Sequence, residues 1–314
     1  MTSAETVAGE VMRSKKYAAL DEAAIMRVCG EAVVKYPKTK DAVKAAKKEL
    51  HIIYGAFVDE GRLERAESMI MNYGGDACGM MRDKAFAARL MELHSSTAER
   101  AGREEEIYSF IGRYFNQRTF ATDIGCGFNP FALPFLPVQP AGYAAYDICA
   151  RTIRTVNLYF SRLNNPSFFA LAADAAAEGV FGGAEKGGGA NSEQGVLDGA
   201  EQSVSNGAER EFFDDVEQGF LAGGAAAAPG TTAVLLMFKL FPLLERQRKG
   251  LGFALLKKLA YSFAIVSFPT KSASGREKGM EGHYSGLFEN GLPERCIIID
   301  KATFGNEMFY VINK

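Results

Sequence analysis

From Thr119 onward, short apolar runs alternate with longer amphipathic segments, and this alternation limits the possible folds more than any other feature of the chain. The spacing predicts strands at 119–124, 142–146, 168–172, 233–237 and 263–268, and helices at 151–163 and 242–259. Strands that alternate with helices form an open, mostly parallel sheet covered by helices. Two more strands, expected at 296–299 and 307–312, are close enough in sequence to form an antiparallel hairpin.

The first 115 residues have a helical pattern instead, so we expect a helical N-terminal region at 1–115 and a sheet domain at 116–314. Asp21 is a candidate N-cap for a helix that ends before Pro37. A second amphipathic helix follows Pro37, and lysines recur along its polar side. A solvated face is the common explanation for such a stripe, and a face that contacts nucleic-acid phosphates is the alternative. These lysines are Lys40, Lys44, Lys47 and Lys48.

Charge is unevenly distributed along the chain. Residues 174–230 hold 11 acidic and two basic residues, and the other residues hold 34 basic and 27 acidic ones. Much of this stretch consists of Gly, Ala, Ser and Glu, too few large apolar residues for a core of its own. We therefore predict a low-complexity acidic insertion at about 176–230. The basic remainder permits a nucleic acid as partner.

Several classes of protein are disfavoured by composition. The five cysteines lack CxxC spacing and there are three histidines, so neither a metal site nor a disulfide framework is expected. The longest apolar run, Ala233 to Leu244, is too short to span a bilayer and contains Lys239 and Pro242. The N-terminus has no signal-peptide pattern. These features predict a cytoplasmic protein with no membrane partner, and we expect a monomer.

The strongest local motif is the stretch Asp123 to Pro130, which contains Gly125 and Gly127 and follows the first predicted strand. Glycines at this position let a ligand approach the backbone at the carboxyl end of the sheet. A dinucleotide fingerprint would have glycine where Pro130 stands, so a nicotinamide oxidoreductase is disfavoured. Asp147, 22 residues after Gly125, ends the next predicted strand and could accept hydrogen bonds from ribose hydroxyls. Together these features favour S-adenosylmethionine, although Asp147 could also be a simple strand-end turn residue.

Two other segments contain residue types that suit a binding site. In the segment His94 to Arg100, the spacing of Ser96 and Glu99 is that of a capping box, and Arg100 could pair with a ligand carboxylate. His94 could equally be a structural histidine. The polar, basic stretch from Ser267 to Glu281 follows the strand at 263–268 and would emerge at the same sheet edge, as a substrate-binding loop would.

With these motifs in order, the chain resembles the aminoglycoside-resistance methyltransferases that act on N7 of guanine 1405 in 16S ribosomal RNA. The resemblance covers nearly the whole chain outside the acidic insertion. It rests on residues 14–17, 50–57, 94–100, 123–130, 146–148, 239–247, 266–280 and 305–307. It implies a class I S-adenosylmethionine-dependent methyltransferase, with a Rossmann-like doubly wound sheet and a terminal antiparallel hairpin, preceded by an α-helical N-terminal region that docks on rRNA.

The resemblance also implies a set of functional residues. Asp174 would reach the adenine amino group of S-adenosylmethionine, and Phe238 would line its pocket. The full cofactor set would be Phe57, His94, Ser95, Ser96, Arg100, Gly125, Asp147, Asp174, Ala175, Phe238 and Gln247. Ser267 and Lys271 would contact the target base, and Arg276 and Lys278 would join the lysine stripe in docking on the 30S subunit.

No single catalytic residue is expected, because guanine N7 carries an in-plane lone pair and no proton. Orientation alone can lower such a barrier by about 7–11 kcal/mol. Phe57 or Tyr54 could stack on the base, and core packing is the alternative for Tyr54. Two alternative functions are a methyltransferase of the same fold acting on another RNA nucleotide or a small molecule, and a non-catalytic ribosome-binding relative. The first would lack the 267–280 loop and the second would have lost Arg100 or Asp147; this chain has all three.

Overall fold

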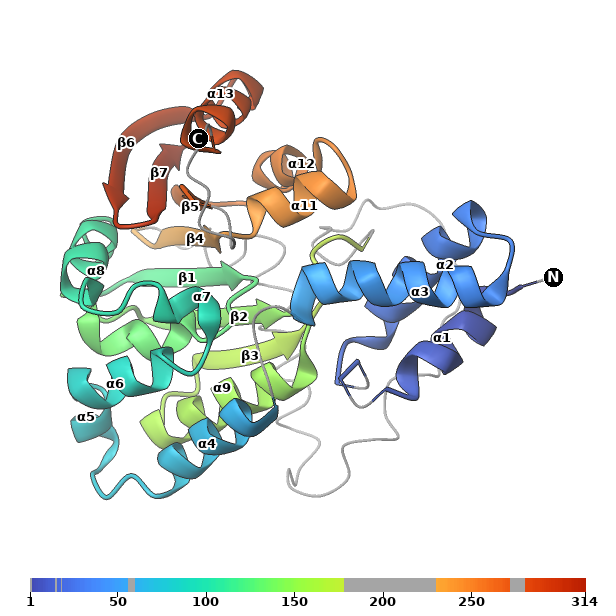
Figure 1. Ribbon diagram of the computed structural model, residues 1–314. Coiled ribbons are helices and arrows are strands. Elements are labelled where there is room, and N and C mark those ends of the chain that lie inside the picture. The colour runs from blue at the N-terminus through green and yellow to red at the C-terminus, as the bar shows by residue number, and fades with distance from the viewer. Residues whose placement is uncertain (1, 15, 18, 56–59, 178–229, 272–279) are drawn as a thin grey trace, which may run out of the picture.

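The computed structural model describes residues 2–14, 16–17, 19–55, 60–177, 230–271 and 280–314. Within these ranges, a mixed sheet lies between two layers of helices, and a group of N-terminal helices lies beside the carboxyl ends of the central strands (Figure 1). Phe57, Arg276, Lys278 and nearly all of the predicted acidic insertion lie outside the described residues.

Three helices at the N-terminus form a bundle with its own core. They are α1 (Ala4–Met12), α2 (Glu22–Lys35) and α3 (Thr39–Leu50), and a π-helical turn at His51–Gly55 follows α3. Asp21 accepts a hydrogen bond from the backbone N–H of Ala24, so the predicted N-cap of α2 is confirmed. Val7, Ile25 and Leu50 are among the residues that fill this core.

The next five helices belong to the sheet rather than to the bundle. They are α4 (Glu60–Met71), α5 (Ala77–Met80), α6 (Lys84–Met91), α7 (Ser95–Ala98) and α8 (Glu104–Gly112). Their apolar side chains, such as Leu63 and Ile107, share one core with strand residues. The helices expected in 1–115 therefore divide between two cores. The N-cap of α7 is His94, so Ser96 lies inside the helix and does not form the capping box that its spacing suggested.

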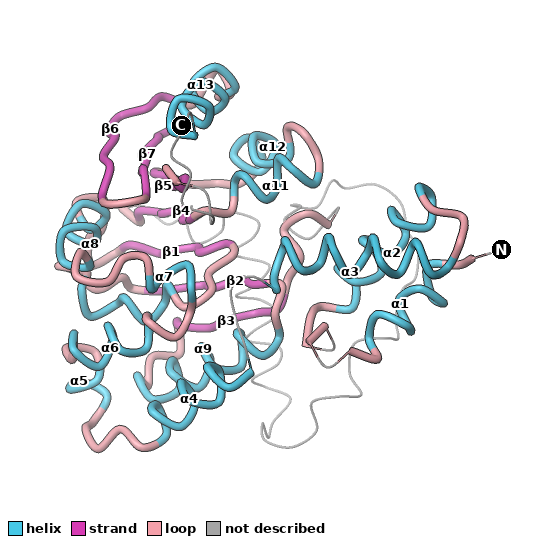
Figure 2. Tube along the Cα trace, viewed as in Figure 1, coloured by secondary structure: helices cyan, strands magenta, loops and turns pink. Residues whose placement is uncertain are grey.

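In the part of the chain that the structure describes, the sheet has seven strands in the order β3-β2-β1-β4-β5-β7-β6. Strands β1 to β5 pair in parallel, and β7 is antiparallel to both of its neighbours. Figure 2 shows the strands in magenta. The strands are β1 (Thr119–Ile124), β2 (Gly142–Asp147), β3 (Phe168–Ala172), β4 (Thr232–Phe238), β5 (Phe263–Pro269), β6 (Ile297–Phe304) and β7 (Glu307–Asn313). The predicted strands, their parallel order and the terminal hairpin are confirmed.

The helices differ from the prediction in two places. The single helix expected at 242–259 is two helices, α11 (Phe241–Gln247) and α12 (Leu251–Lys258), because Gly250 adopts a left-handed conformation with φ of 82°. The helix α13 (Met280–Gly291) was not predicted. The described residues also form the predicted helix α9 (Ala150–Leu163) and a 3₁₀ segment at Asn129–Phe135.

Alternate strand residues face opposite sides of the sheet and build two cores. On one side, Ala121 and Tyr143 pack with residues of α4, α6, α8 and α9. On the other, Ile124 and Ala144 pack with α11, α12 and α13. Both faces are thus covered, which is the arrangement expected of a parallel sheet.

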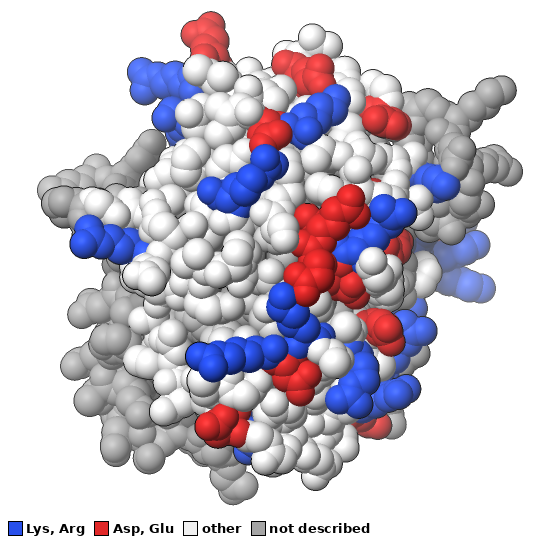
Figure 3. Space-filling view, turned by 90° about the vertical axis from the view of Figure 1, so that its left-hand side faces the viewer, with Lys and Arg blue, Asp and Glu red and all other residues white. Residues whose placement is uncertain are grey.

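The described residues form no helix that is both long and apolar enough to cross a membrane. On the face that carries α8 and β6, acidic and basic side chains lie interspersed (Figure 3). Ion pairs there join the end of α8 to β6 and β6 to α13, with Arg113 Nη2 2.9 Å from Asp300 Oδ2 and Lys301 Nζ 3.0 Å from Glu289 Oε1.

Candidate functional site

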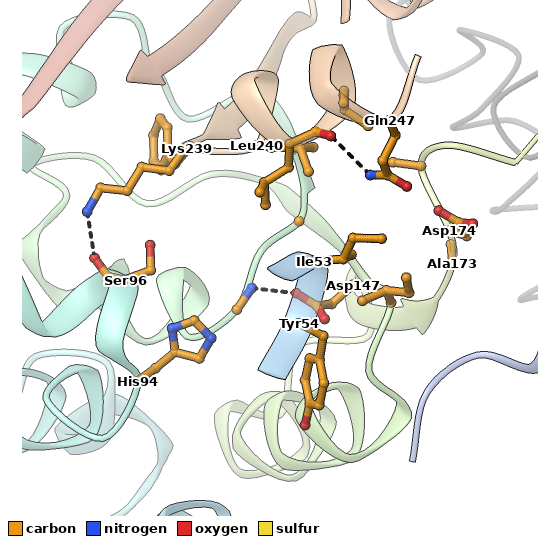
Figure 4. Close-up of a pocket in the computed structure, with 17 residues that line it drawn as sticks. Ile53, Tyr54, His94, Ser96, Asp147, Ala173, Asp174, Lys239, Leu240 and Gln247 are labelled. Carbon is orange, nitrogen blue, oxygen red and sulfur yellow. Dashed lines mark hydrogen bonds between the residues drawn. The ribbon is translucent and has the colours of Figure 1, made fainter. Parts of the chain in front are cut away.

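A pocket opens at the carboxyl ends of β1, β2, β3 and β4, where open α/β sheets bind their ligands (Figure 4). Loops after these strands form its floor, and the π-helical turn after α3 and the first turn of α7 form two of its walls. Figure 4 shows Asp174 and Gln247 at one end, and His94, Ser96 and Lys239 at the other. Its lining comprises Ile53, Tyr54, His94, Ser96, Gly125, Gly127, Asp147, Ile148, Ala173, Asp174, Ala175, Phe238, Lys239, Leu240, Leu243, Leu244 and Gln247.

The loop after β1 needs both of its glycines. Gly125 and Gly127 have φ values of 69° and 48°, which side-chain-bearing residues rarely adopt. A Cβ on Gly125 would lie 3.0 Å from a methyl of Leu240, and one on Gly127 would lie 2.8 Å from Cε1 of His94. Because Gly125 and Gly127 have no side chains, the floor of the pocket stays open at these two positions.

The side chain of Asp147 is fixed at the end of β2 by two backbone donors. Its Oδ2 accepts from the N–H of Gly127 at 3.0 Å, and its Oδ1 accepts from the N–H of Cys149 at 2.9 Å. Burial raises the pKa of this carboxyl, while the backbone N–H groups act in the opposite direction. Each carboxylate oxygen has a second lone pair, so Asp147 can still accept hydrogen bonds from a ligand.

The end of the pocket near β3 combines a carboxylate and an amide with apolar walls. Asp174 Oδ1 accepts from the N–H of Ala176 at 2.9 Å, and Gln247 Nε2 donates to the carbonyl of Leu243 at 3.2 Å. Ile53 and Leu244 supply apolar surface. This end suits a flat, apolar ring that carries polar groups on its edge.

The opposite end of the pocket is basic. Lys239 has a left-handed backbone (φ 54°), and its Nζ donates to the carbonyl of Ser96 at 3.0 Å and lies 2.6 Å from Glu99 Oε2. His94 is 6% exposed. Burial, with the charges of Lys239, Arg100 and Arg62, lowers the pKa of His94 to about 3, so its ring is neutral at pH 7.

Arg100 lies behind this end and does not line the pocket among the described residues. Its Nε and Nη2 donate to the two carboxylate oxygens of Glu307 at 2.9 and 2.8 Å, and its Nη1 donates to the hydroxyl of Tyr108 and to Asn129 Oδ1. Four of its five N–H groups thus have protein acceptors. The pairing with a ligand carboxylate expected from sequence would have to share this guanidinium with Glu307.

Glu307 gathers several donors in a fully buried position. Besides Arg100, Ser267 Oγ donates to it at 2.5 Å, and Lys239 Nζ lies 3.4 Å away. Burial alone would raise the pKa of Glu307, but the charges of Arg100 and Lys239 outweigh burial and lower it to about 2. Ser267, expected to contact the target base, is fully buried and faces this carboxylate.

A second buried carboxylate, that of Asp123, lies near the end of β1, just before the glycine loop. Asp123 Oδ2 accepts from Asn129 Nδ2 at 2.8 Å and from the hydroxyl of Tyr143 at 2.7 Å. Burial raises the pKa of Asp123 to about 6, and its two hydrogen bonds oppose that rise. Within the described ranges, no three His, Cys, Asp or Glu side chains come together in a way that could hold a metal ion.

Most of the predicted cofactor residues converge on the one pocket. Those that line it are His94, Ser96, Gly125, Asp147, Asp174, Ala175, Phe238 and Gln247. Ser95 begins α7 but is not part of the lining, and Lys271, two residues after β5, is also outside it. The stripe lysines lie on α3, with Lys40, Lys44 and Lys48 exposed and Lys47 half-buried.

Sequence reasoning missed two polar residues at the site. Lys239 belongs to one of the family motifs, but its contacts could not be predicted. Its partners Ser96 and Glu99 lie more than 100 residues away in sequence. Arg27, on α2, contacts both Asp174 and Gln247, and no local sequence pattern indicates these contacts.

The fold and the site together define a class of protein. A seven-stranded sheet with a reversed β7, a glycine loop after β1 and an acid at the end of β2 is the arrangement of class I S-adenosylmethionine-dependent methyltransferases.

Comparison with known proteins narrows this class to one family. The family model described as "Ribosomal RNA methyltransferase (FmrO)" matches residues 13–179 and 214–311, and the chain belongs to this family. A relative from Serratia marcescens is 32% identical over 97% of this chain and 96% of its own length, and one from Proteus mirabilis is 29% identical over 99% and 97%. Both are named 16S rRNA (guanine(1405)-N(7))-methyltransferase. In fold, the chain is similar to the 16S rRNA methyltransferase RmtF in complex with S-adenosyl-L-homocysteine, with a TM-score of 0.72 at 24% identity over 100% and 99% of the two chains.

Proposed function

We propose that this protein transfers a methyl group from S-adenosylmethionine to N7 of guanine 1405 in the 16S rRNA of the 30S subunit, and thereby confers resistance to 4,6-disubstituted aminoglycosides. The observation that carries the proposal is a complete pocket of the methyltransferase class in a chain that matches relatives named for this reaction over 97% or more of its length.

The residues of the pocket fit S-adenosylmethionine along its whole length. The apolar end beside Asp174 and Gln247 suits adenine, and Asp147 has free lone pairs for the ribose hydroxyls. The basic end, with Lys239 and the neighbouring Arg100, suits the carboxylate of the methionine arm. Phe57, proposed for the same site, follows Ile53 and Tyr54 in sequence.

The proposed reaction needs position rather than a protein base. When bound, S-adenosylmethionine supplies a methyl group on a positively charged sulfur. The lone pair of guanine N7 forms the new N–C bond as the C–S bond breaks, and sulfur keeps the electron pair. Because N7 has no proton to lose, the contribution of the protein is to hold the two reactants in line. His94, neutral at pH 7, adds no positive charge beside the cationic sulfur.

RNA docking is assigned to basic side chains around the pocket. Lys40, Lys44 and Lys48 are exposed on α3. The carboxyl end of this helix leads into the turn that forms one pocket wall. Lys271 lies at the end of the sheet where the target base would enter, and Arg276 and Lys278 are proposed to act with it. Flipping the base out of its helix would cost a few kcal/mol. A substrate of this kind implies a cytoplasmic enzyme, which we propose acts as a monomer.

The test is to express the protein in a susceptible bacterium and map 16S rRNA by mass spectrometry and primer extension. Methylation at N7 of guanine 1405 is expected, with resistance to gentamicin and kanamycin and continued sensitivity to apramycin and neomycin. The modification removes an acceptor and adds positive charge where these polycationic drugs bind, and an unpaired buried polar group costs about 1–3 kcal/mol. Asp147→Ala serves as the inactive control. Modification of a neighbouring adenine with apramycin resistance would instead identify a same-fold enzyme with another target.

A further inference from the structure

Arg27 connects the N-terminal bundle to the far end of the pocket. It extends from α2 and donates from Nε to Asp174 Oδ2 at 2.7 Å and from Nη2 to Gln247 Oε1 at 2.6 Å. These partners are 147 and 220 residues away in sequence. The side chain of Arg27 is 19% exposed and that of Asp174 is 4% exposed, so the ion pair is shielded from water.

These contacts fix the hydrogen-bonding direction of both partners. Gln247 turns its carbonyl oxygen toward Arg27, and its NH₂ group then donates to the carbonyl of Leu243. Asp174 is held by Arg27 on one oxygen and by the N–H of Ala176 on the other. A carboxylate held on both oxygens in this way presents its remaining lone pairs in a fixed direction. Arg27 itself does not line the pocket among the described residues.

We propose that Arg27 is a positioning residue that sets the selectivity of this pocket for the 6-amino group of adenine, acting through Asp174 and Gln247. The inference rests on the proposed function, in which adenine lies beside Asp174, and takes Asp174 as the acceptor for that amino group. A carboxylate whose lone pairs are fixed in direction favours an N–H donor at position 6 of the purine. It disfavours an oxo group there, because two acceptors would face each other without a proton.

The proposal distinguishes Arg27 from a residue that only fastens the bundle to the sheet. Loss of a purely structural contact would lower the affinity for every ligand of the pocket alike, because it would disturb the whole pocket wall. A positioning residue for the amino group would affect ligands that carry this group and spare those that lack it. The ratio of two affinities therefore separates the two roles.

The experiment compares two ligands by calorimetry. They are S-adenosylhomocysteine and S-inosylhomocysteine, which has an oxo group in place of the 6-amino group. The variants are Arg27→Ala and Arg27→Lys, and the matched control is Arg13→Ala, which removes an arginine from an exposed pair with Glu10 in the same bundle. In Arg27→Ala, affinity for the adenosyl ligand should fall about tenfold, the scale of one hydrogen bond to a charged group. Affinity for the inosyl ligand should change little, so selectivity should fall by a similar factor.

Arg27→Lys keeps the charge but cannot donate to Asp174 and Gln247 through a planar fork, so we expect it to recover part of the selectivity. Arg13→Ala should match the wild type for both ligands. Equal weakening of both ligands in a folded Arg27→Ala variant would overturn the proposal. If that variant does not fold, unchanged selectivity in Arg27→Lys would overturn it. A wild-type protein that bound neither ligand would contradict the proposed function itself, a result distinct from either of these.

Discussion

A single buried carboxylate, Glu307, ties together three residues that the sequence had placed in separate motifs. Arg100, Lys239 and Ser267 all contact it at the basic end of the pocket. An ion pair hidden from water is costly to disrupt, because the remaining charge has neither solvent nor partner. The arrangement that shapes this end of the pocket is therefore also a point on which stability depends.

Replacing Glu307 by Gln should lower the free energy of unfolding by about 3–5 kcal/mol, since Arg100 would keep its charge without a counterion. Urea denaturation at pH 7 measures this loss. The control Glu105→Gln removes an exposed partner of Lys84 and should cost about 0–1 kcal/mol. A Glu307→Gln variant as stable as this control would show that the ion pair contributes no net stability.

The ion pair between Arg100 and Glu307 also predicts that the free energy of unfolding depends on pH. The pKa of Glu307 is about 2 in the folded protein, below its ordinary value of 4.5. A carboxyl with a lowered pKa contributes stability that is fully present above its unfolded value and is lost as pH falls through the folded one. The stability difference between wild type and Glu307→Gln should therefore shrink as pH falls from about 4.5 to about 2. A difference that stayed constant over this range would contradict the assignment.

Residues marked by a motif at a strand end were predictable, and those that reach the site from elsewhere were not. Gly125 and Asp147 follow predicted strands, so the parallel sheet alone brings them together. Arg27 and Lys239 act through contacts across more than 100 residues. Arg100 was expected to pair with a ligand carboxylate, and sequence could not reveal that Glu307 lies against it.

At the scale of elements, the strands were easier to predict than the helices. Buried parallel strands are continuous apolar runs, and five such runs separated by helices or loops indicate the sheet directly. The split between α11 and α12 depends on the left-handed backbone of Gly250, which a glycine permits but does not require. α13 has only a weak apolar periodicity, so its sequence does not predict a helix. Tertiary packing of Phe288 on β5 and β7 stabilises it instead.

α3 gives a prediction at this scale, because its apolar side is buried and Lys40, Lys44 and Lys48 are exposed. Replacing Lys40, Lys44 and Lys48 together by Glu should weaken binding to the 30S subunit and reduce its dependence on salt concentration, since fewer phosphates would be neutralised. Filter binding at several salt concentrations measures both effects. Affinity for S-adenosylhomocysteine serves as the control and should not change. Unaltered 30S affinity would mean that the stripe is only a solvated face.

At the scale of the whole molecule, the pocket lies where the N-terminal bundle contacts the sheet domain. Tyr54 of the bundle accepts a hydrogen bond from the thiol of Cys149 after β2, and the backbone N–H of Asp21 donates to the carbonyl of Ile148. The bundle thus contacts the pocket on the Asp147 side through these bonds and on the Asp174 side through Arg27. Any ligand that fills the pocket contacts residues from both cores.

Binding of S-adenosylhomocysteine should therefore stabilise the bundle and the sheet together. At a free concentration 100 times its Kd, a ligand adds about 2.7 kcal/mol to the stability of the state that binds it. Amide hydrogen exchange should slow in α2 and at His51 to Tyr54 as well as in the loop after β2. Exchange in the β6 edge strand, remote from the pocket, is the internal reference. Protection confined to the sheet would show that the bundle does not share in binding.

The strand order also has a consequence for the chain as it is made. β1 lies between β2 and β4, yet Thr232, the first residue of β4, is synthesised long after Ala172, the last residue of β3. Roughly 60 residues at about 5–20 residues per second leave an interval of about 3–12 s. During that interval β1 is an edge strand with unpaired backbone groups, the feature that invites wrong association between chains. The pairing of β1 with β4 thus waits until this interval has passed, and slower translation between β3 and β4 would extend the time for which each new molecule stays vulnerable.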